Sequence, residues 1–149
     1  MRNAYINIGT NKGDRHRNIE VAVALVIDMT ARAMGIRSAD VDFALSGIYE
    51  SEPWGYDSPN RFLNQGMRIA LPSDMSPYEI LDILQSAQDS ISTDSHRKAD
   101  GSYADRLIDI DFIALDDVSI VSERLTLPHP RAHQRAFVMQ PLIETLPRM

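Results

Sequence analysis

The fold is decided by the stretch RLIDIDFIAL, residues 106–115, which predicts one buried β-strand. Aliphatic and β-branched residues dominate it, and neither glycine nor proline interrupts it. Because side chains alternate between the faces of a strand, Asp109 and Asp111 should point one way while Ile110 and Phe112 face a core. Two neighbouring carboxylates in an apolar strand are costly unless a cation joins them. The pair is therefore either a Mg²⁺ site completed by phosphate oxygens or two charges on a solvated sheet face.

The length and composition limit the class of protein. At 149 residues, the chain is expected to form a single domain over residues 1–149 with its own core. The absence of cysteine excludes disulfides and thiolate metal sites, and the start of the chain lacks a signal-peptide pattern, so a cytoplasmic protein is expected. No apolar run approaches the ~20 residues of a membrane helix. The net charge of −6 argues against nucleic-acid binding, so any polyanion must meet a local cluster of cations.

The rest of the sequence predicts an alternation of strands and helices. The expected elements are a strand at 4–8, a turn at 9–14, a helix at 15–34 stopped by Gly35, strands at 41–51 and 61–71, and a helix from Pro77 to about Ile91 capped by Ser76. A short strand at 118–121 is expected to form a hairpin with the aspartate strand. This order is that of a ferredoxin-like split βαβ fold, an α+β class with helices packed on an antiparallel sheet. The glycines of 9–14 match neither the dinucleotide nor the Walker A pattern, which favours a plain strand-to-helix turn.

Cationic and aromatic residues fall in three segments outside these elements. The polar segment 89–105 contains His96, Arg97 and Lys98, and it is either a functional lid or a disordered surface loop. The tail places His129 close to Arg131 and Arg135, which suits a polyphosphate site but equally a surface turn. The loop at 52–60 contains the only tryptophan and leads into Phe62 and Asn64. An acid pair, clustered cations and flat rings together indicate nucleotide-dependent group transfer.

The sequence resembles the 6-hydroxymethyl-7,8-dihydropterin pyrophosphokinase family of folate biosynthesis over essentially its whole length. The motifs that carry this resemblance occur in the family's order: IGTN at 8–11 followed by GD at 13–14, SEPWG at 51–55, FLN at 62–64, DRLIDID at 105–111, and LTLPHPR at 125–131 followed by RAFV at 135–138.

The resemblance implies an ATP-dependent diphosphotransferase that moves pyrophosphate from ATP to the hydroxymethyl group of the pterin and releases AMP. Asp109 and Asp111 would hold two Mg²⁺ ions. The positions matching the catalytic set are Arg106, Asp109, Asp111, His129 and Arg135. Those matching ATP-binding positions are Gln85, Gln88, Arg97, Lys98, Arg106, Arg124, Thr126, His129 and Arg135. Those matching the pterin site are Ser51, Pro53, Trp54, Gly55, Phe62, Asn64 and Phe137, with the two phenylalanines stacking on the ring.

The sequence departs from the family at a few positions, and other functions stay open. Asp105 stands where the family usually has proline, and Gln88 where many members have glutamate. The Gly-Arg pair common after the second helix is absent, so the lid cation could be His96, Arg97 or Lys98. A monomer acting on small molecules, without nucleic-acid or membrane partners, is expected. The alternatives are a non-catalytic ferredoxin-like binding module for a nucleotide or other ligand, and a different two-metal nucleotide enzyme.

Overall fold

The computed structural model describes residues 1–51, 60–92, 107–130 and 142–146. In chain order, its elements are β1 (Arg2–Thr10), α1 (Arg15–Met34), the 3₁₀ turn η1 (Ser38–Asp40), β2 (Phe43–Ser51), β3 (Phe62–Leu71), α2 (Pro77–Ile91), β4 (Asp109–Leu115), β5 (Ile120–Val121) and β6 (Thr126–Leu127).

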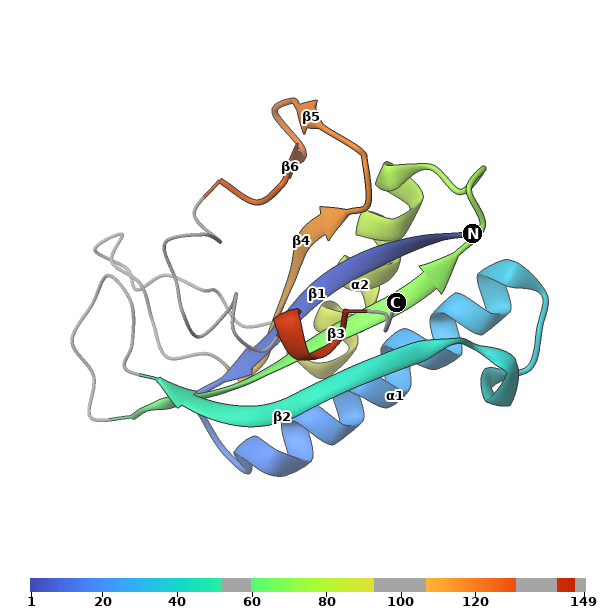
Figure 1. Ribbon diagram of the computed structural model, residues 1–149. Helices are drawn as coiled ribbons and strands as arrows, with labels where there is room; N and C mark the ends of the chain where they lie inside the picture. Colours follow the sequence, from blue (N-terminus) through green and yellow to red (C-terminus); the bar gives the residue numbers. More distant parts are fainter. Residues whose placement is uncertain (52–59, 93–106, 131–141, 147–149) are drawn as a thin grey trace.

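The centre of the molecule is an antiparallel sheet, which within the described residues has four strands in the order β2-β3-β1-β4. Both long helices lie on one side of this sheet (Figure 1). This is the α+β, ferredoxin-like arrangement that the order of elements predicted. Among the described strands, β4 lies at one edge of the sheet, with β1 as its neighbour.

Local signals in the sequence fix the ends of both helices. The carboxylate of Asp14 accepts a hydrogen bond from the Arg17 N–H and caps α1. Gly35 ends α1 in the left-handed conformation, with φ of 68°, as its position predicted. The Ser76 hydroxyl accepts from the Tyr78 N–H at 3.1 Å, and Pro77 opens α2.

The main core fills the space between the helices and the sheet. From the sheet it takes the side chains of alternate positions, among them Ile6 and Ile8 of β1, Met67 of β3 and Ile110 of β4. Helix α2 contributes Leu84, which is 2% exposed. This alternation confirms the predicted division of the aspartate strand into a core face and an opposite face.

The opposite face is covered near its middle by the short segment 142–146, which lies across the sheet from the two helices (Figure 1). Arg68 donates from Nε to the Thr145 carbonyl at 2.8 Å, and Leu142 packs against Ile113. Burial raises the pKa of the Tyr5 phenol on this face; the charge of Asp116 adds to the increase and Arg68 opposes it. No helix among the described residues is long and apolar enough to cross a membrane.

One predicted strand pairing and several strand bounds were wrong, including those of the first strand, which spans Arg2–Thr10 and not 4–8. The segment at 118–121 does not pair with the aspartate strand; β5 pairs instead with β6, with Ile120 opposite Leu127. The reason is that β4 ends in a turn at Asp116, after which the chain leaves the sheet (Figure 1). The aspartate strand also begins at Asp109 and not at 106, and the strand after α1 begins at Phe43 and not at 41.

Candidate active site

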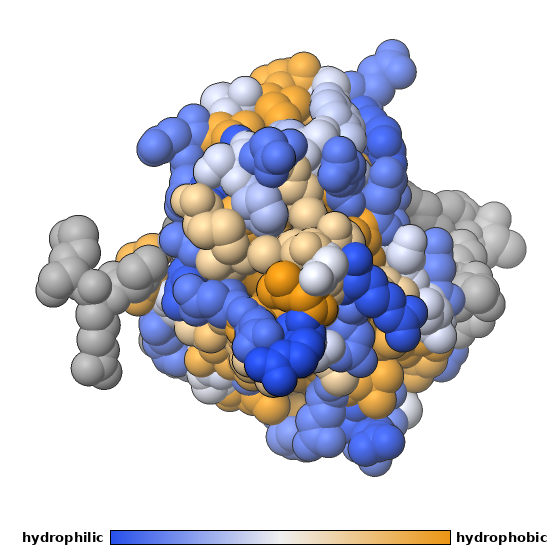
Figure 2. Space-filling view, turned by 90° about the vertical axis from the view of Figure 1, so that its right-hand side faces the viewer, coloured by the Kyte–Doolittle hydropathy of each residue, from blue (hydrophilic) through white to orange (hydrophobic). Residues whose placement is uncertain are grey.

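The predicted metal and pterin residues of the sheet lie at one end of it, where β1 and β2 finish and β3 and β4 begin. Gly9 of β1 lies opposite Asn64 of β3 on one side and opposite Asp109 of β4 on the other. Directly opposed residues point to the same face, and neighbouring strands are ~4.8 Å apart, so Asn64 and Asp109 stand roughly 10 Å apart across the glycine. Figure 2 views the other end of the molecule, where charged and polar groups surround smaller apolar areas.

A cavity of about 410 Å³ brings together the described residues of the predicted nucleotide and metal sites. Its walls come from the end of α2, the start of β4 and the segment from β5 to residue 130. Of the predicted site residues, those lining it are Gln85, Gln88, Asp109, Asp111, Arg124, Thr126 and His129. Residues more than 40 positions apart in sequence thus share one cavity.

The amide of Gln88 attaches the strand with the acid pair to α2. Its Oε1 accepts a hydrogen bond of 2.9 Å from the N–H of Ile110, the residue between Asp109 and Asp111. Ile110 is on the edge strand, and its N–H points away from β1, so without Gln88 this donor would lose its protein partner. This hydrogen bond fixes the position of the β4 backbone relative to α2, and with it the position of Asp109 and Asp111 in the cavity wall.

The segment 122–130, which forms the remaining wall of this cavity, is held by contacts to β4 and α2. The backbone N–H of His129 donates to the Ile113 carbonyl at 2.7 Å, which sets the chain after β6 against β4. Arg124 forms an ion pair with Asp82 of α2, and its guanidinium lies 5.8 Å from the centre of the Tyr78 ring. Arg124, which was predicted to bind the nucleotide, therefore lies in the cavity wall, and its guanidinium is paired with a carboxylate of α2.

The turn between β1 and α1 supports the start of β4 from the other side. Thr10 Oγ1 donates to the Leu107 carbonyl at 2.6 Å, and Asn18 Nδ2 donates to the same oxygen at 3.2 Å. Gly13 has φ of 73° and packs against Leu107, where an added Cβ would stand 3.2 Å from the leucine side chain. This turn fixes the chain two residues before Asp109.

The described residues of the predicted pterin site form a compact group on the face away from the helices. Asn64 is 2% exposed, and its Nδ2 donates to the Ser51 hydroxyl at 2.8 Å. Phe62 lies opposite Ser51 on the same face and is half-buried. The absence of a side chain at Gly9 gives both residues room, because a Cβ there would stand 3.1 Å from Asn64 Oδ1 and 3.5 Å from Phe62 Cδ1.

The remaining predicted site residues lie outside the described parts of the chain. They are Pro53, Trp54, Gly55, Arg97, Lys98, Arg106, Arg135 and Phe137. The predicted lid and the second half of the ring-stacking pair therefore stay predictions.

The acid pair suits a magnesium ion shared with phosphate. Over residues 1–51, 60–92, 107–130 and 142–146, no three His, Cys, Asp or Glu side chains form a complete metal cage. Mg²⁺ typically takes one or two carboxylates and completes its shell with water and substrate phosphate, so Asp109 and Asp111 on a cavity wall fit that requirement.

Comparison with protein families decides the relationship. The model of the family described as 7,8-dihydro-6-hydroxymethylpterin-pyrophosphokinase (HPPK) matches residues 5–147. The chain belongs to the HPPK family. The resemblance seen in the motifs is thereby confirmed, and the chain is a pyrophosphokinase by family.

Curated members of the HPPK family match nearly the whole chain. A 2-amino-4-hydroxy-6-hydroxymethyldihydropteridine pyrophosphokinase of Porphyromonas gingivalis is 37% identical over 96% of this chain and 90% of its own length. Proteins of the same name from Bacillus subtilis and Methylorubrum extorquens are 32% and 31% identical, over 95% and 99% of this chain and 76% and 84% of their own lengths.

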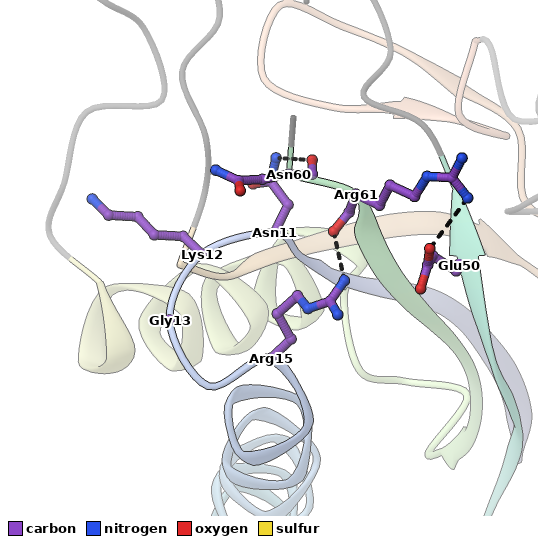
Figure 3. Close-up of a pocket in the computed structure, with 7 residues that line it drawn as sticks. All are labelled: Asn11, Lys12, Gly13, Arg15, Glu50, Asn60 and Arg61. Atoms are coloured by element: carbon purple, nitrogen blue, oxygen red, sulfur yellow. Dashed lines mark hydrogen bonds and ion pairs between the residues drawn. The ribbon is translucent and has the colours of Figure 1, made fainter. Parts of the chain in front are cut away.

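Sequence reasoning missed a second cavity in this HPPK chain, of about 420 Å³, beside the pterin residues. The turn at 11–13, predicted only as a connection, lines it together with Arg15, Glu50, Asn60 and Arg61. Figure 3 shows Arg15 reaching toward the Arg61 carbonyl, to which it donates at 2.9 Å, while Arg61 pairs with Glu50 at 3.3 Å. The available signal was that Glu50 and Arg61 directly adjoin the pterin residues Ser51 and Phe62.

Proposed function

We propose that this chain transfers the β,γ-pyrophosphoryl group of ATP to the hydroxymethyl oxygen of 6-hydroxymethyl-7,8-dihydropterin, as a step of folate biosynthesis. That oxygen bonds to the β-phosphorus, the bond from this phosphorus to the α-bridging oxygen breaks, AMP leaves with the bridging oxygen, and the hydroxyl proton is lost. The observation that carries the proposal is that the acid pair and the nucleotide residues line one cavity, a single strand away from Asn64. The names of the HPPK relatives supply the pterin and the pyrophosphoryl group.

Asp109 and Asp111 are the proposed magnesium ligands, and two ions are expected. When bound there, Mg²⁺ would neutralise the charge that develops on the phosphate oxygens. The carboxylates face the cavity because they alternate with core residues of β4, and Gln88 holds the intervening backbone. His129 and Arg124, with Arg106 and Arg135 outside the described residues, would contact the triphosphate, and the arginines would supply positive charge.

The proposed pterin site uses a buried amide and an aromatic ring. Asn64 presents its Oδ1 while Ser51 accepts from its Nδ2, so the amide is fixed in orientation and can recognise the amide edge of the ring. Phe62 offers a flat apolar surface for offset stacking, with Phe137 as the expected partner on the other side. Holding both substrates at this end of the sheet makes the transfer effectively unimolecular, which accounts for much of the rate enhancement.

The proposal includes the wider setting expected from the sequence. One domain over residues 1–149 acts as a monomer in the cytoplasm, since a single copy supplies the predicted residues and the chain has no cysteine. ATP and the pterin are its small-molecule substrates.

Product analysis tests this proposal. The protein is incubated with ATP, Mg²⁺ and 6-hydroxymethyl-7,8-dihydropterin, and nucleotides and pterins are separated by chromatography. AMP and pterin diphosphate should appear in equal amounts. ADP or free pyrophosphate as the main product would point to a different nucleotide enzyme, and no product together with no Mg²⁺-dependent ATP binding would favour a non-catalytic module.

Variants of the acid pair test the assigned metal role. Asp109→Asn and Asp111→Asn should each reduce turnover at least a hundredfold with a circular-dichroism spectrum like that of the parent, because each removes a charged metal ligand and no core group. Asp117→Asn, an exposed aspartate just after β4, is the matched control and should retain parent activity. Near-normal turnover in either acid-pair variant would show that the substituted aspartate is not a magnesium ligand.

A further inference from the structure

Asn7 occupies the position between the proposed metal ligands and the proposed pterin residues. On β1 it lies opposite Asp111 of β4 and opposite Gly66 of β3, on the face away from the helices. Asn64 is two residues from Gly66, which makes it a diagonal neighbour of Asn7, at roughly 7–8 Å between backbones. The side chain of Asn7 is thus placed where the pterin ring ends and the phosphates begin.

The amide oxygen of Asn7 is buried and has no hydrogen-bond partner among the described residues. Asn7 is 4% exposed, and its Oδ1 is one of two such buried side-chain atoms in that part of the chain. A buried acceptor without a donor is unfavourable in a folded protein and calls for a specific explanation.

No residue beside Asn7 in the sheet donates to its Oδ1. Gly66 has no side chain, and the carboxylates of Asp111 and Asp109 accept hydrogen bonds. The two diagonal neighbours direct their donors elsewhere, Asn64 to Ser51 and Arg68 to Thr145 and Asn3. A bound ligand is therefore a source of the missing donor. The proposed function supplies one at this place, because the hydroxymethyl group joins the ring near Asn64 to the phosphates near the acid pair.

We propose that Asn7 Oδ1 accepts a hydrogen bond from the hydroxymethyl O–H of the bound pterin. This inference rests on the proposed function. The bond would direct the hydroxyl proton toward β1 and leave a lone pair of the oxygen free to face the β-phosphorus. Asn7 is then a substrate-positioning residue that selects pterins with a hydroxyl group at this point.

A comparison of two pterins tests the proposal without measuring turnover. Calorimetric titrations of the parent protein and of Asn7→Leu are run with 6-hydroxymethylpterin and with 6-methylpterin, which lacks the hydroxyl, each with and without a non-hydrolysable ATP analogue and Mg²⁺. Leucine has the same branched shape as asparagine and needs no donor, although its two methyl groups make it bulkier. Asn7→Leu should bind 6-hydroxymethylpterin about tenfold more weakly and 6-methylpterin with unchanged affinity, while its Tm equals or exceeds that of the parent.

Asn3→Leu is the matched control, because Asn3 is on the same strand and the same face but four residues away. Its Oδ1 accepts from Arg68 Nη1 at 3.1 Å, so this variant should lose stability without a change in the affinity for either pterin. Asn7→Ala repeats the test with a smaller side chain if leucine prevents folding.

The other outcomes each reject the proposal in a distinct way. If Asn7→Leu binds 6-hydroxymethylpterin with an affinity within twofold of the parent value, the proposed hydrogen bond from the hydroxyl group to Asn7 Oδ1 does not form. Equal weakening for both pterins would show that Asn7 only shapes the site, and weakening of both that requires Mg²⁺ and nucleotide would assign Oδ1 to a metal-bound water. Failure of the parent protein to bind 6-hydroxymethylpterin at all would reject the proposed function together with this inference.

Discussion

At the scale of the residue, the site depends on Gly9. This glycine separates the proposed pterin and metal residues in the sheet, and its backbone is directly opposite both. The nearest atom to a Cβ at this position would be Asn64 Oδ1, a buried amide already bonded to Ser51. The lack of a side chain at Gly9 therefore sets the position of Asn64, the residue proposed to recognise the ring.

Gly9→Ala should weaken pterin binding by about tenfold and leave nucleotide binding within twofold. A Cβ at 3.1 Å from Asn64 Oδ1 and 3.5 Å from Phe62 Cδ1 must displace one of these groups, whereas the nucleotide cavity does not include Gly9. Calorimetric titration with each ligand measures the difference. Gly47→Ala is the control, since the nearest atoms to its Cβ would be 3.9 Å away. Equal losses for both ligands would contradict the assignment of Asn64.

Alternation along a strand was sufficient to predict the acid pair, but not Asn7. Asp109 and Asp111 stand out because they interrupt an apolar run, and their shared face follows from a period of two. Asn7 is a single polar residue in the same kind of run, and its significance depends on which side chains of β3 and β4 lie opposite it. That pairing is a tertiary property, so the sequence of β1 alone does not contain it.

At the scale of the element, α2 acts as the support of β4. Gln88 is the direct link, through its bond to the Ile110 N–H, and Arg124 adds a link to Asp82 from the opposite wall. The helix also buries Leu84 and Ala87 against the sheet. Its position therefore affects where the acid pair lies and how wide the proposed nucleotide cavity is.

Gln88→Leu should destabilise the protein by about 1–3 kcal/mol, because the Ile110 N–H loses its acceptor. Nucleotide affinity should fall several-fold as β4 becomes less firmly held. Gln88→Glu keeps an acceptor oxygen and should restore most of the stability. Denaturant titration and nucleotide calorimetry measure the two effects, with Asp89→Asn on the exposed side of α2 as the control. A Gln88→Leu variant as stable as the parent would show that this bond contributes nothing.

Helix ends were predictable because their signals are local, whereas the pairing of short strands was not. Asp14, Gly35, Ser76 and Pro77 act within a few residues of themselves, and both helices have the predicted bounds. Strand β5 has two residues, too few to specify a partner by pattern. Its pairing with β6 is set by the turn after β4 and by the bond from the Ser122 N–H to the Leu125 carbonyl.

At the scale of the whole molecule, ligand binding should couple to unfolding. ATP with Mg²⁺ at about a hundred times its Kd should stabilise the fold by about 2.7 kcal/mol, which corresponds to a rise in Tm of about 5–10 °C for a chain of this size. Addition of EDTA should remove most of this rise, because the triphosphate would then face Asp109 and Asp111 without a cation. Scanning calorimetry measures both. The same rise with and without EDTA would contradict a metal-bridged nucleotide.

The acid-pair variants extend this experiment. Asp111→Asn should show little stabilisation by ATP and Mg²⁺, whereas the control Asp117→Asn should show the full rise in Tm. A full rise in Asp111→Asn would mean that the nucleotide binds without this ligand, even if turnover is lost.

The strand order has a consequence for how the protein is made. On the ribosome, β1 emerges first and must wait for β4, whose partner residues lie about a hundred positions later in the chain. A nascent chain that ends before Asp109 can contain β1, β2 and β3 but neither proposed magnesium ligand. Activity should therefore arise abruptly and late in synthesis, when the edge strand joins the sheet.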